Sequence, residues 1–362
     1  MASLTPERLR FLHDLLHAHG PSGHEGPAAA VWRREAESFA RVDHDVLGSS
    51  FASVGPDQGA PVLLLGHIDE IGLIVSHIED EDADYDGKLR MQPLGSWDAE
   101  VLVGQHVELR TANGTLVPGV IGKLPIHIAP ADGPSRSSMA TLWVDIGARD
   151  ADDARRITSV GDTAVLIGEP RELANGQLAG KALDNRTGAW IVLEAARRVA
   201  ERGGGSVPVV ACACVIEETL GEGARAAAHR VDPAISIVVD VTHASDIPGG
   251  LLGRTGVQVP GRGPTLTRGL GLNHKLTARL AAVAAEAGIS MQPEALSGGD
   301  STFTDIDGAL RALAGSATAL VSIPLRHMHS PAEVCSLSDL DEAAELIARL
   351  CLALDGSEDW RN

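Results

Sequence analysis

Four short apolar runs, each ending in or leading directly into acidic or imidazole side chains, constrain the fold of this chain most strongly. They read PVLLLGH at 61–67, VVACACVIEE at 209–218, AISIVVD at 234–240 and TALVSIP at 318–324. Unbroken apolar runs of this length are typical of strands that are buried on both faces of a sheet. From about residue 180 onward, segments with helical apolar spacing separate the runs. This alternation predicts an α/β fold, with a mixed, largely parallel sheet flanked by helices.

The segment from about residue 72 to 165 has a different texture. Short β-rich runs such as HVELRTANGTLVPGVIG and ATLWVDIGA alternate with glycine, asparagine and aspartate turns. Closely spaced strands with turn signals between them indicate a small β-barrel or sandwich. We therefore expect an α/β domain built from residues 1–70 and 166–362, interrupted by a β-rich insertion at 71–165.

The N-terminal residues and the charge balance narrow the class of protein. The first twenty residues predict an amphipathic helix with Thr5 as N-cap, Pro6 in the first turn and Gly20 as the stop, rather than a signal peptide. The net charge of −19 argues against nucleic acid or an anionic membrane as the main partner. The four cysteines lack metal-motif spacing and predict buried, reduced thiols. We expect a cytoplasmic protein.

Polar residues gather at the carboxyl ends of the expected strands, where open α/β sheets bind ligands. Each of them has an ordinary explanation, such as a turn acid, a solvated charge or, for Asp184 at the start of a long helix, an N-cap. Together, two imidazoles and three or four carboxylates suit a pair of borderline metals such as zinc, cobalt or manganese. The residues at the strand ends are His67, Asp69, Glu217, Glu218, Asp240, His327 and His329.

The adjacent glutamates Glu217 and Glu218 fit such a site. Two neighbouring carboxylates at one strand end repel each other and raise one pKa. A bound dication relieves the repulsion by taking one carboxylate as a ligand, and the other carboxylate can then carry protons beside the metal.

Eight motifs occur in a fixed order along nearly the whole chain: PSGHEG, GHIDEIGLIV, GVIG, WVDIGA, KALDNRTG, VIEETLGEGA, VVDVTHASDIPG and IPLRHMHSPAEV. In this order, and with the long gap between Asp69 and Asp184 filled by the β-rich insertion, the chain resembles the tetrahedral aminopeptidases. These are cytosolic dinuclear metallopeptidases, also called glutamyl or deblocking aminopeptidases. The resemblance implies a metal-dependent aminopeptidase that hydrolyses the N-terminal peptide bond of short peptides.

The resemblance also implies a role for each site residue. Glu217 would be the general acid/base, and Asp69 would orient the imidazole of His67. His327 stands where the family often has tyrosine and is not assigned as a ligand. The cofactors would be two divalent metal ions per subunit, zinc first, with cobalt or manganese also compatible. The implied ligands are His67 and Asp240 for one metal, Glu218 and His329 for the other, and Asp184 as a bridge to both.

The inserted domain resembles the family's dimerisation domain, which implies a homo-oligomer, namely a tetrahedral dodecamer built from dimers. One loop departs from the family pattern. In SGGDSTFTDIDGALRAL, Thr304 and Asp305 match a Thr-Asp pair of the family, but Phe303 replaces a glycine near the substrate pocket. The side-chain preference of relatives therefore does not transfer. The scarcity of aromatics and the small residues of this loop favour small or aliphatic N-terminal residues.

Two alternative functions remain open. One is a dinuclear deacylase or amidase that acts on acylated amino acids or modified dipeptides, and the other is a relative that binds peptides without cutting them. A glycosidase is disfavoured because it needs two free carboxylates beside the sugar. A serine hydrolase is disfavoured because the chain has no GxSxG elbow.

Overall fold

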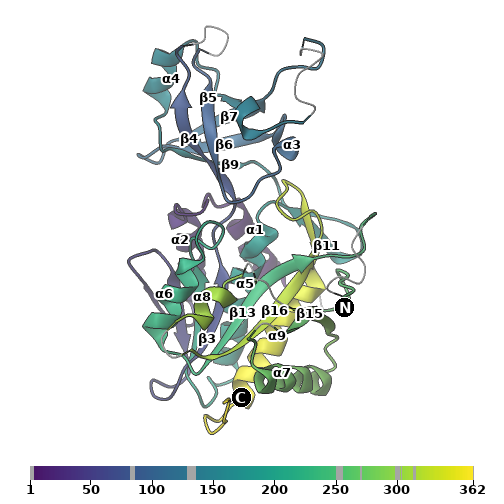
Figure 1. Ribbon diagram of the computed structural model, residues 1–362. Coiled ribbons are helices and arrows are strands. Elements are labelled where there is room, and N and C mark those ends of the chain that lie inside the picture. Colours follow the sequence, from purple (N-terminus) through teal and green to yellow (C-terminus); the bar gives the residue numbers. More distant parts are fainter. Residues whose placement is uncertain are drawn as a thin grey trace.

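The computed structural model describes residues 4–81, 86–128, 136–249, 256–269, 271–297, 302, 304–312 and 315–361. These residues form a β-barrel that stands above an α/β layer structure (Figure 1). The chain enters the barrel directly after β3 and leaves it after β9, so the barrel interrupts the α/β part in sequence. Phe303, the residue that departs from the family pattern, lies outside the described residues.

The α/β part is built on an eight-stranded sheet of order β1-β2-β12-β3-β13-β16-β14-β15. Its four central strands, β12, β3, β13 and β16, run parallel, whereas β2 and β14 pair with them antiparallel. The prediction of a mixed, largely parallel sheet is confirmed. The strands are β1 (Arg41–His44), β2 (Ser50–Val54), β3 (Val62–His67), β12 (Val209–Cys214), β13 (Ile235–His243), β14 (Thr265–Gly269), β15 (Gln292–Leu296) and β16 (Ala317–Leu325). A smaller sheet contains β10 (Arg171–Glu172), β11 (Gln177–Gly180) and β17 (Glu333–Ser336).

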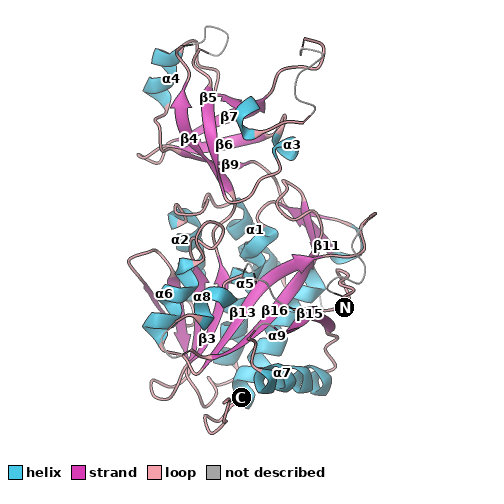
Figure 2. Cartoon of the chain, viewed as in Figure 1, coloured by secondary structure: helices cyan, strands magenta, loops and turns pink. Residues whose placement is uncertain are grey.

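Helices cover both faces of the large sheet (Figure 2). Along β3, Leu64 belongs to the core beneath α1, α2, α5, α7 and α9, whereas Leu63 and Leu65 belong to the core beneath α6 and α8. This alternation follows from the two-residue period of a strand and explains why the run is apolar throughout. The helices are α1 (Pro6–His17), α2 (Gly26–Ala36), α5 (Leu183–Glu201), α6 (Glu222–Val231), α7 (His274–Ala287), α8 (Ile306–Leu310) and α9 (Leu337–Ala353).

Strand β3 and helix α5 approach each other closely at two glycines. A Cβ atom on Gly66 would lie 2.5 Å from the carbonyl carbon of Gly188 and 2.7 Å from the nitrogen of Ala189. Both neighbours are backbone atoms, which cannot yield as a flexible side chain can. The absence of a side chain at Gly66 therefore lets the first turns of α5 lie against the end of β3.

The insertion folds into a closed six-stranded barrel of order β4-β5-β8-β7-β6-β9 with an apolar core of its own. Closure pairs the strand edges that an open sheet would leave exposed. The expectation of a barrel-like β-rich insertion is confirmed. Its elements are β4 (Gly72–Ile78), β5 (Leu89–Leu94), α3 (Ala99–Leu102), β6 (His106–Arg110), β7 (Leu116–Gly122), β8 (Trp143–Asp145), α4 (Ala151–Ile157) and β9 (Thr163–Leu166).

Two element ends differ from the sequence prediction. Thr5 caps α1 as expected, but the helix ends at His17, where the chain turns to an extended conformation, so Gly20 is not its stop. Strand β13 continues past Asp240 to His243 because β16 pairs with it along its whole length. Within the described part of the chain, no helix is both long enough and apolar enough to span a membrane.

Candidate active site

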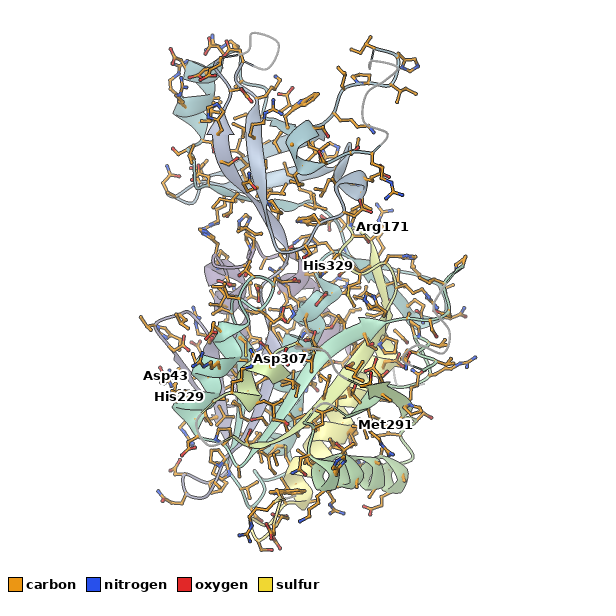
Figure 3. All side chains as sticks on the ribbon, viewed as in Figure 1. Asp43, Arg171, His229, Met291, Asp307 and His329 are labelled. Atoms are coloured by element: carbon orange, nitrogen blue, oxygen red, sulfur yellow. The ribbon has the colours of Figure 1, made fainter. Side chains whose placement is uncertain are left out.

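The residues predicted at strand ends meet at one edge of the central sheet, below the barrel. His67 is the last residue of β3, Asp240 lies near the end of β13, and Glu217 and Glu218 follow β12. His329 follows β16 and lies at the end of the α/β part that faces the barrel (Figure 3). Because the four strands are parallel, their carboxyl ends lie at the same edge, which brings these distant segments together.

Asp184 reaches this edge from α5. It has non-helical backbone angles (φ −82°, ψ 107°), is joined to Asn185 by a cis peptide bond, and follows Ala182, which occupies the N-cap position. Asn185, rather than Asp184, caps the first turn of α5, because the Oδ1 atom of Asn185 accepts the backbone N–H of Gly188 at 2.9 Å. The side chain of Asp184 contacts the imidazoles at the strand ends instead.

His67, Asp184 and Asp240 form a first cluster of candidate metal ligands, with one ligand atom from each lying within 4.8 Å of the others. The Nε2 atom of His67 lies 3.3 Å from Asp184 Oδ1 and 3.8 Å from Asp240 Oδ1. All three side chains are buried. A single cation placed among them would contact one nitrogen and two oxygens.

Asp184, Glu218 and His329 form a second cluster of the same kind. The Nε2 atom of His329 lies 3.4 Å from Asp184 Oδ2 and 3.5 Å from Glu218 Oε2. The two oxygens of Asp184 thus face different clusters. Glu218 Oε1 is buried and has no hydrogen-bond partner among the described residues. Imidazole and carboxylate donors in these proportions suit zinc, cobalt or manganese, so the residues fit a pair of divalent cations.

Asp69 supports both the imidazole and the glutamate pair. Its Oδ1 atom lies 3.3 Å from His67 Nδ1, opposite the nitrogen that faces the first cluster. Its two oxygens also accept the backbone N–H groups of Glu217, at 3.3 Å, and Glu218, at 3.0 Å. One buried carboxylate therefore lies against the imidazole of His67 and accepts two hydrogen bonds from the turn that follows β12.

Glu25 holds the same turn from the other side. Its Oε1 atom accepts the backbone N–H groups of Gly23, at 2.7 Å, and Ile216, at 2.9 Å. Ile216 has a φ of +53°, a conformation that is uncommon for a β-branched residue. The turn thus depends on the carboxylates of Glu25 and Asp69, and it explains how two consecutive glutamates both reach one cavity.

Burial and mutual repulsion of the carboxylates at this site favour the binding of protons or cations. Burial raises the pKa of Glu217 to about 8 and raises the pKa of Glu218 and Asp240 well above their usual values. Burial alone would lower the pKa of His67, but the surrounding carboxylates of Glu217, Asp184 and Asp69 raise it instead. Burial opposes ionisation of Asp184, yet hydrogen bonds from the two imidazoles hold its pKa below the usual range. Divalent cations would satisfy this demand in place of protons.

Glu333 is a site residue that sequence reasoning missed. Its Oε1 atom accepts the backbone N–H of His329 at 2.9 Å, and its Oε2 atom accepts that of Asp184 at 3.1 Å. The side chain is buried, and burial beside Asp184 raises its pKa well above the usual value. One carboxylate thus ties together the backbones of two candidate ligands. The only signal in the sequence was its place in the motif HSPAEV.

Two other predicted positions lie at the margin of the site. His327 is exposed and belongs to neither cluster, as expected for a residue that is not a ligand. Asp305 is buried near the Cys214 thiol, and burial raises its pKa to about 7. Of the Thr-Asp pair in the atypical loop, Asp305 is therefore buried, whereas Thr304 is half-buried.

A cavity of about 730 Å³ opens beside both clusters. Its walls include the turn after β12, the ends of β13 and β15, and the residues that precede and begin α8. The barrel contributes Ser96, so the insertion forms part of the rim. A space of this size admits one or two amino-acid residues of a ligand but not a folded protein surface.

The fold and the paired clusters define a class of protein: an α/β protein with two clusters of candidate metal ligands at the carboxyl ends of its strands and an inserted barrel. Residues 48–346 match the M42 glutamyl aminopeptidase family. The chain belongs to this family and is a peptidase of the aminopeptidase type.

Solved structures and sequence relatives agree with this assignment. The TET aminopeptidase of the marine sediment archaeon Thaumarchaeota archaeon SCGC AB-539-E09 has a TM-score of 0.89 and 33% identity, covering 96% of this chain and 97% of that one. The lysyl aminopeptidase of Pyrococcus furiosus is 33% identical over 85% of this chain and 86% of its own length. The TET1 peptidase of Pyrococcus horikoshii, which can assemble into a tetrahedron or a large octahedral shell, has a TM-score of 0.84 and 27% identity, covering 96% of this chain and all of that one. The resemblance seen in the sequence is confirmed.

Proposed function

We propose that the chain is a dinuclear metal-dependent aminopeptidase that removes the N-terminal residue of short peptides, with Glu217 as the group that transfers protons. The observation that carries the proposal is the division of Asp184 between two clusters, with Oδ1 facing His67 and Oδ2 facing His329. A structural carboxylate would need only one such partner. A carboxylate that bridges two cations presents one oxygen to each.

The proposed ligands are His67 and Asp240 on one side, Glu218 and His329 on the other, and Asp184 between them. Two bound cations would supply polarisation of the scissile carbonyl and activation of a water molecule. The identity of the metal is a further proposal: zinc is favoured by the mixed nitrogen and oxygen donors, and cobalt and manganese accept the same set.

Glu217 is suited to move the proton. Its Oε2 atom lies 3.7 Å from His67 Nε2, it lines the cavity, and it belongs to neither cluster. Burial raises its pKa to about 8 in the metal-free site, and bound cations would lower that pKa toward the range in which the carboxylate accepts a proton from water. In this role Glu217 removes a proton from the attacking water and delivers it to the departing amine. Asp69 keeps Glu217 in place through the backbone N–H that it accepts.

Self-association is part of the proposal. The barrel exposes a group of apolar side chains on β7 and the loop after it, with exposed fractions from 39% to 78%. Apolar side chains that are exposed together on one element commonly mark an interface. We propose that the insertion at 71–165 is a dimerisation domain, that residues 1–70 and 166–362 form the catalytic domain, and that dimers assemble into a dodecameric shell. The exposed side chains are Leu116, Val120, Leu124, Ile126 and Ile128.

Reduced thiols suggest where the protein works. All four cysteines are free and buried. Cysteines in this state are typical of a reducing compartment, which supports a cytoplasmic location.

One experiment tests the reaction and the role of Glu217 together. The purified chain is dialysed against zinc, cobalt or manganese and assayed on aminoacyl-aminomethylcoumarin substrates, with N-acetylated substrates in parallel. We expect hydrolysis of the free-amine substrates only. Glu217→Gln should reduce kcat by about 10²–10⁴-fold while two metal ions per chain are retained by elemental analysis.

The controls separate this proposal from its alternatives. Glu37→Gln changes an exposed glutamate after α2 and should leave turnover unchanged. Cleavage of the N-acetylated substrates would favour a deacylase. Uptake of less than one metal ion per chain by folded protein would contradict the dinuclear site.

A further inference from the structure

Besides Glu217, the described residues that line the cavity include a second buried acid that belongs to neither cluster. Glu294 lies on β15, lines the cavity, and is only 4% exposed. It is far along the chain from every proposed ligand, and no motif of the sequence analysis contains it. A buried carboxylate in the wall of a substrate cavity is a candidate for a contact with the substrate.

Two threonine hydroxyls hold this carboxylate in place. Thr242 donates to Oε1 at 2.7 Å and Thr267 donates to Oε2 at 2.6 Å. Thr267 is the direct neighbour of Glu294 across the β14–β15 ladder. Thr242 is two residues after Asp240 on β13, so both side chains leave the same face of that strand. The carboxylate is therefore fixed beside the proposed metal cluster, within the same cavity.

The carboxylate has acceptor capacity left and no positive partner. A carboxylate accepts about four hydrogen bonds, and the two threonines supply one each. None of the ion pairs among the described residues involves Glu294. Removing a charged group from water without an opposite charge is unfavourable. A cationic group of a bound substrate would remove this penalty.

The arginines of the cavity lie in a different environment. Arg225 is 54% exposed and is paired with Glu222 at 3.3 Å, and Arg311 is also exposed. Charges near water are screened, whereas a charge in the buried wall acts at full strength. The buried carboxylate of Glu294 therefore contributes more to the electrostatic potential inside the pocket than the two exposed arginines do. A negative potential there favours a positively charged substrate side chain over a negatively charged one.

The cavity that Glu294 lines also offers apolar surface to a long side chain. Leu296, Leu320 and Met328 also line the cavity. Lysine and arginine place their methylene stems along apolar surfaces of this kind and carry the charge at the tip.

We propose that Glu294 forms the base of the pocket for the N-terminal side chain and that the preferred substrates are peptides that begin with lysine or arginine. This inference rests on the proposed aminopeptidase function and names its substrate class. It differs from the small or aliphatic preference that composition favoured. The same carboxylate could in principle receive the α-ammonium group, which every peptide carries, and the test distinguishes the two.

The test compares kcat/KM for lysyl-, arginyl-, leucyl-, alanyl- and glutamyl-aminomethylcoumarin after metal reconstitution. In the unchanged protein, the lysyl and arginyl substrates should be cleaved fastest and the glutamyl substrate slowest. Glu294→Gln should lower kcat/KM for the two basic substrates by about 10- to 100-fold, the range expected for losing a hydrogen bond to a charged group, and should change the leucyl value less than about twofold. Glu286→Gln, an exposed glutamate on α7, should change none of them.

The leucyl and alanyl substrates also report that the variant is folded and loaded with metal. An equal loss on all five substrates would assign Glu294 to the α-ammonium group and overturn the proposal. So would an unchanged ratio of lysyl to leucyl cleavage in Glu294→Gln. If the unchanged protein cleaves leucyl but not lysyl substrate, only the Glu294 inference fails. If it cleaves none of the five, the proposed function fails and the inference with it.

Discussion

Glu70 offers the sharpest test of how the chain positions its site. It lies immediately after Asp69 and is buried between two cations that are themselves buried, Lys181 and Arg186. Its Oε2 atom is 2.6 Å from Lys181 Nζ, and its Oε1 atom is 2.9 Å from Arg186 Nη2. The two cations stand three residues before and two residues after Asp184. The ion triad therefore fixes the segment that carries the proposed bridging ligand.

The cost of Glu70→Gln can be bounded from these contacts. Removing one partner of a buried ion pair typically destabilises a protein by about 3–5 kcal/mol, because a buried charge is left behind. Arg186 keeps its hydrogen bonds to the backbone carbonyls of Leu15, Ala18 and Ile68, so the uncompensated charge is mainly that of Lys181. Burial already lowers the pKa of Lys181, and Glu70 opposes this shift.

In the Glu70→Gln variant, Lys181 can become neutral by losing its proton. Deprotonating an ordinary lysine at pH 7.5 costs about 4 kcal/mol, since each pKa unit is worth about 1.4 kcal/mol. The loss of unfolding free energy cannot exceed this cost, so we expect Glu70→Gln to lose about 3–4 kcal/mol of stability. The double variant Glu70→Gln/Lys181→Met removes the stranded charge and should recover at least half of the loss, because an apolar replacement of a buried ion pair is often neutral or stabilising.

The assay is guanidinium unfolding followed by circular dichroism, with chelator present so that metal binding does not add to the stability of the folded state. The exposed variant Glu37→Gln serves as the matched control. A loss below about 1 kcal/mol for Glu70→Gln, or a double variant less stable than the single one, would refute the view that a stranded charge dominates.

Two further predictions concern the support of the site and the interface between its two parts. Glu333→Gln should weaken metal binding by about 10- to 100-fold in chelator competition. The reason is that the side chain accepts the backbone N–H groups of Asp184 and His329, and glutamine leaves one of them without its acceptor. An unchanged metal affinity would show that other contacts hold this backbone. Burial lowers the pKa of His19 to about 4, so its neutral form stabilises the fold above the ordinary pKa of about 6.5, and this contribution is lost as the pH falls toward 4. The variant His19→Gln can keep a hydrogen bond to Thr163 of the barrel but has no group that titrates. Between pH 7 and pH 4 it should therefore lose about 2–3 kcal/mol less stability than the unchanged protein, as measured by thermal melting in chelator. Equal losses in the two proteins would contradict a lowered pKa of His19.

The sequence by itself determined the architecture and indicated which residues gather at the candidate site. Apolar runs such as the one ending at His67 fix buried strands, because only a strand covered on both faces is apolar at every position. Their parallel arrangement then brings the residues that follow them to one edge. The spacing of turns at 71–165 similarly indicated a small barrel or sandwich, and the closed strand order of the structure shows that it is a barrel.

Only the tertiary structure showed how the candidate site is held and which buried carboxylates line its cavity. The supporting carboxylates Glu25, Glu70 and Glu333 act through backbone N–H groups and cations that lie far away in sequence, so their role has no periodicity to reveal it. Asp184 was open to interpretation as a helix cap until the structure showed that Asn185 accepts the backbone N–H of the first turn instead. Glu294 belongs to none of the sequence motifs, and its proposed role rests on its burial in the cavity wall. That the carboxylate accepts hydrogen bonds from two threonines, and that no ion pair among the described residues involves it, could be seen only in the folded structure. Local sequence records which elements form and what chemistry they carry, whereas burial and charge pairing between distant segments exist only after the chain has folded.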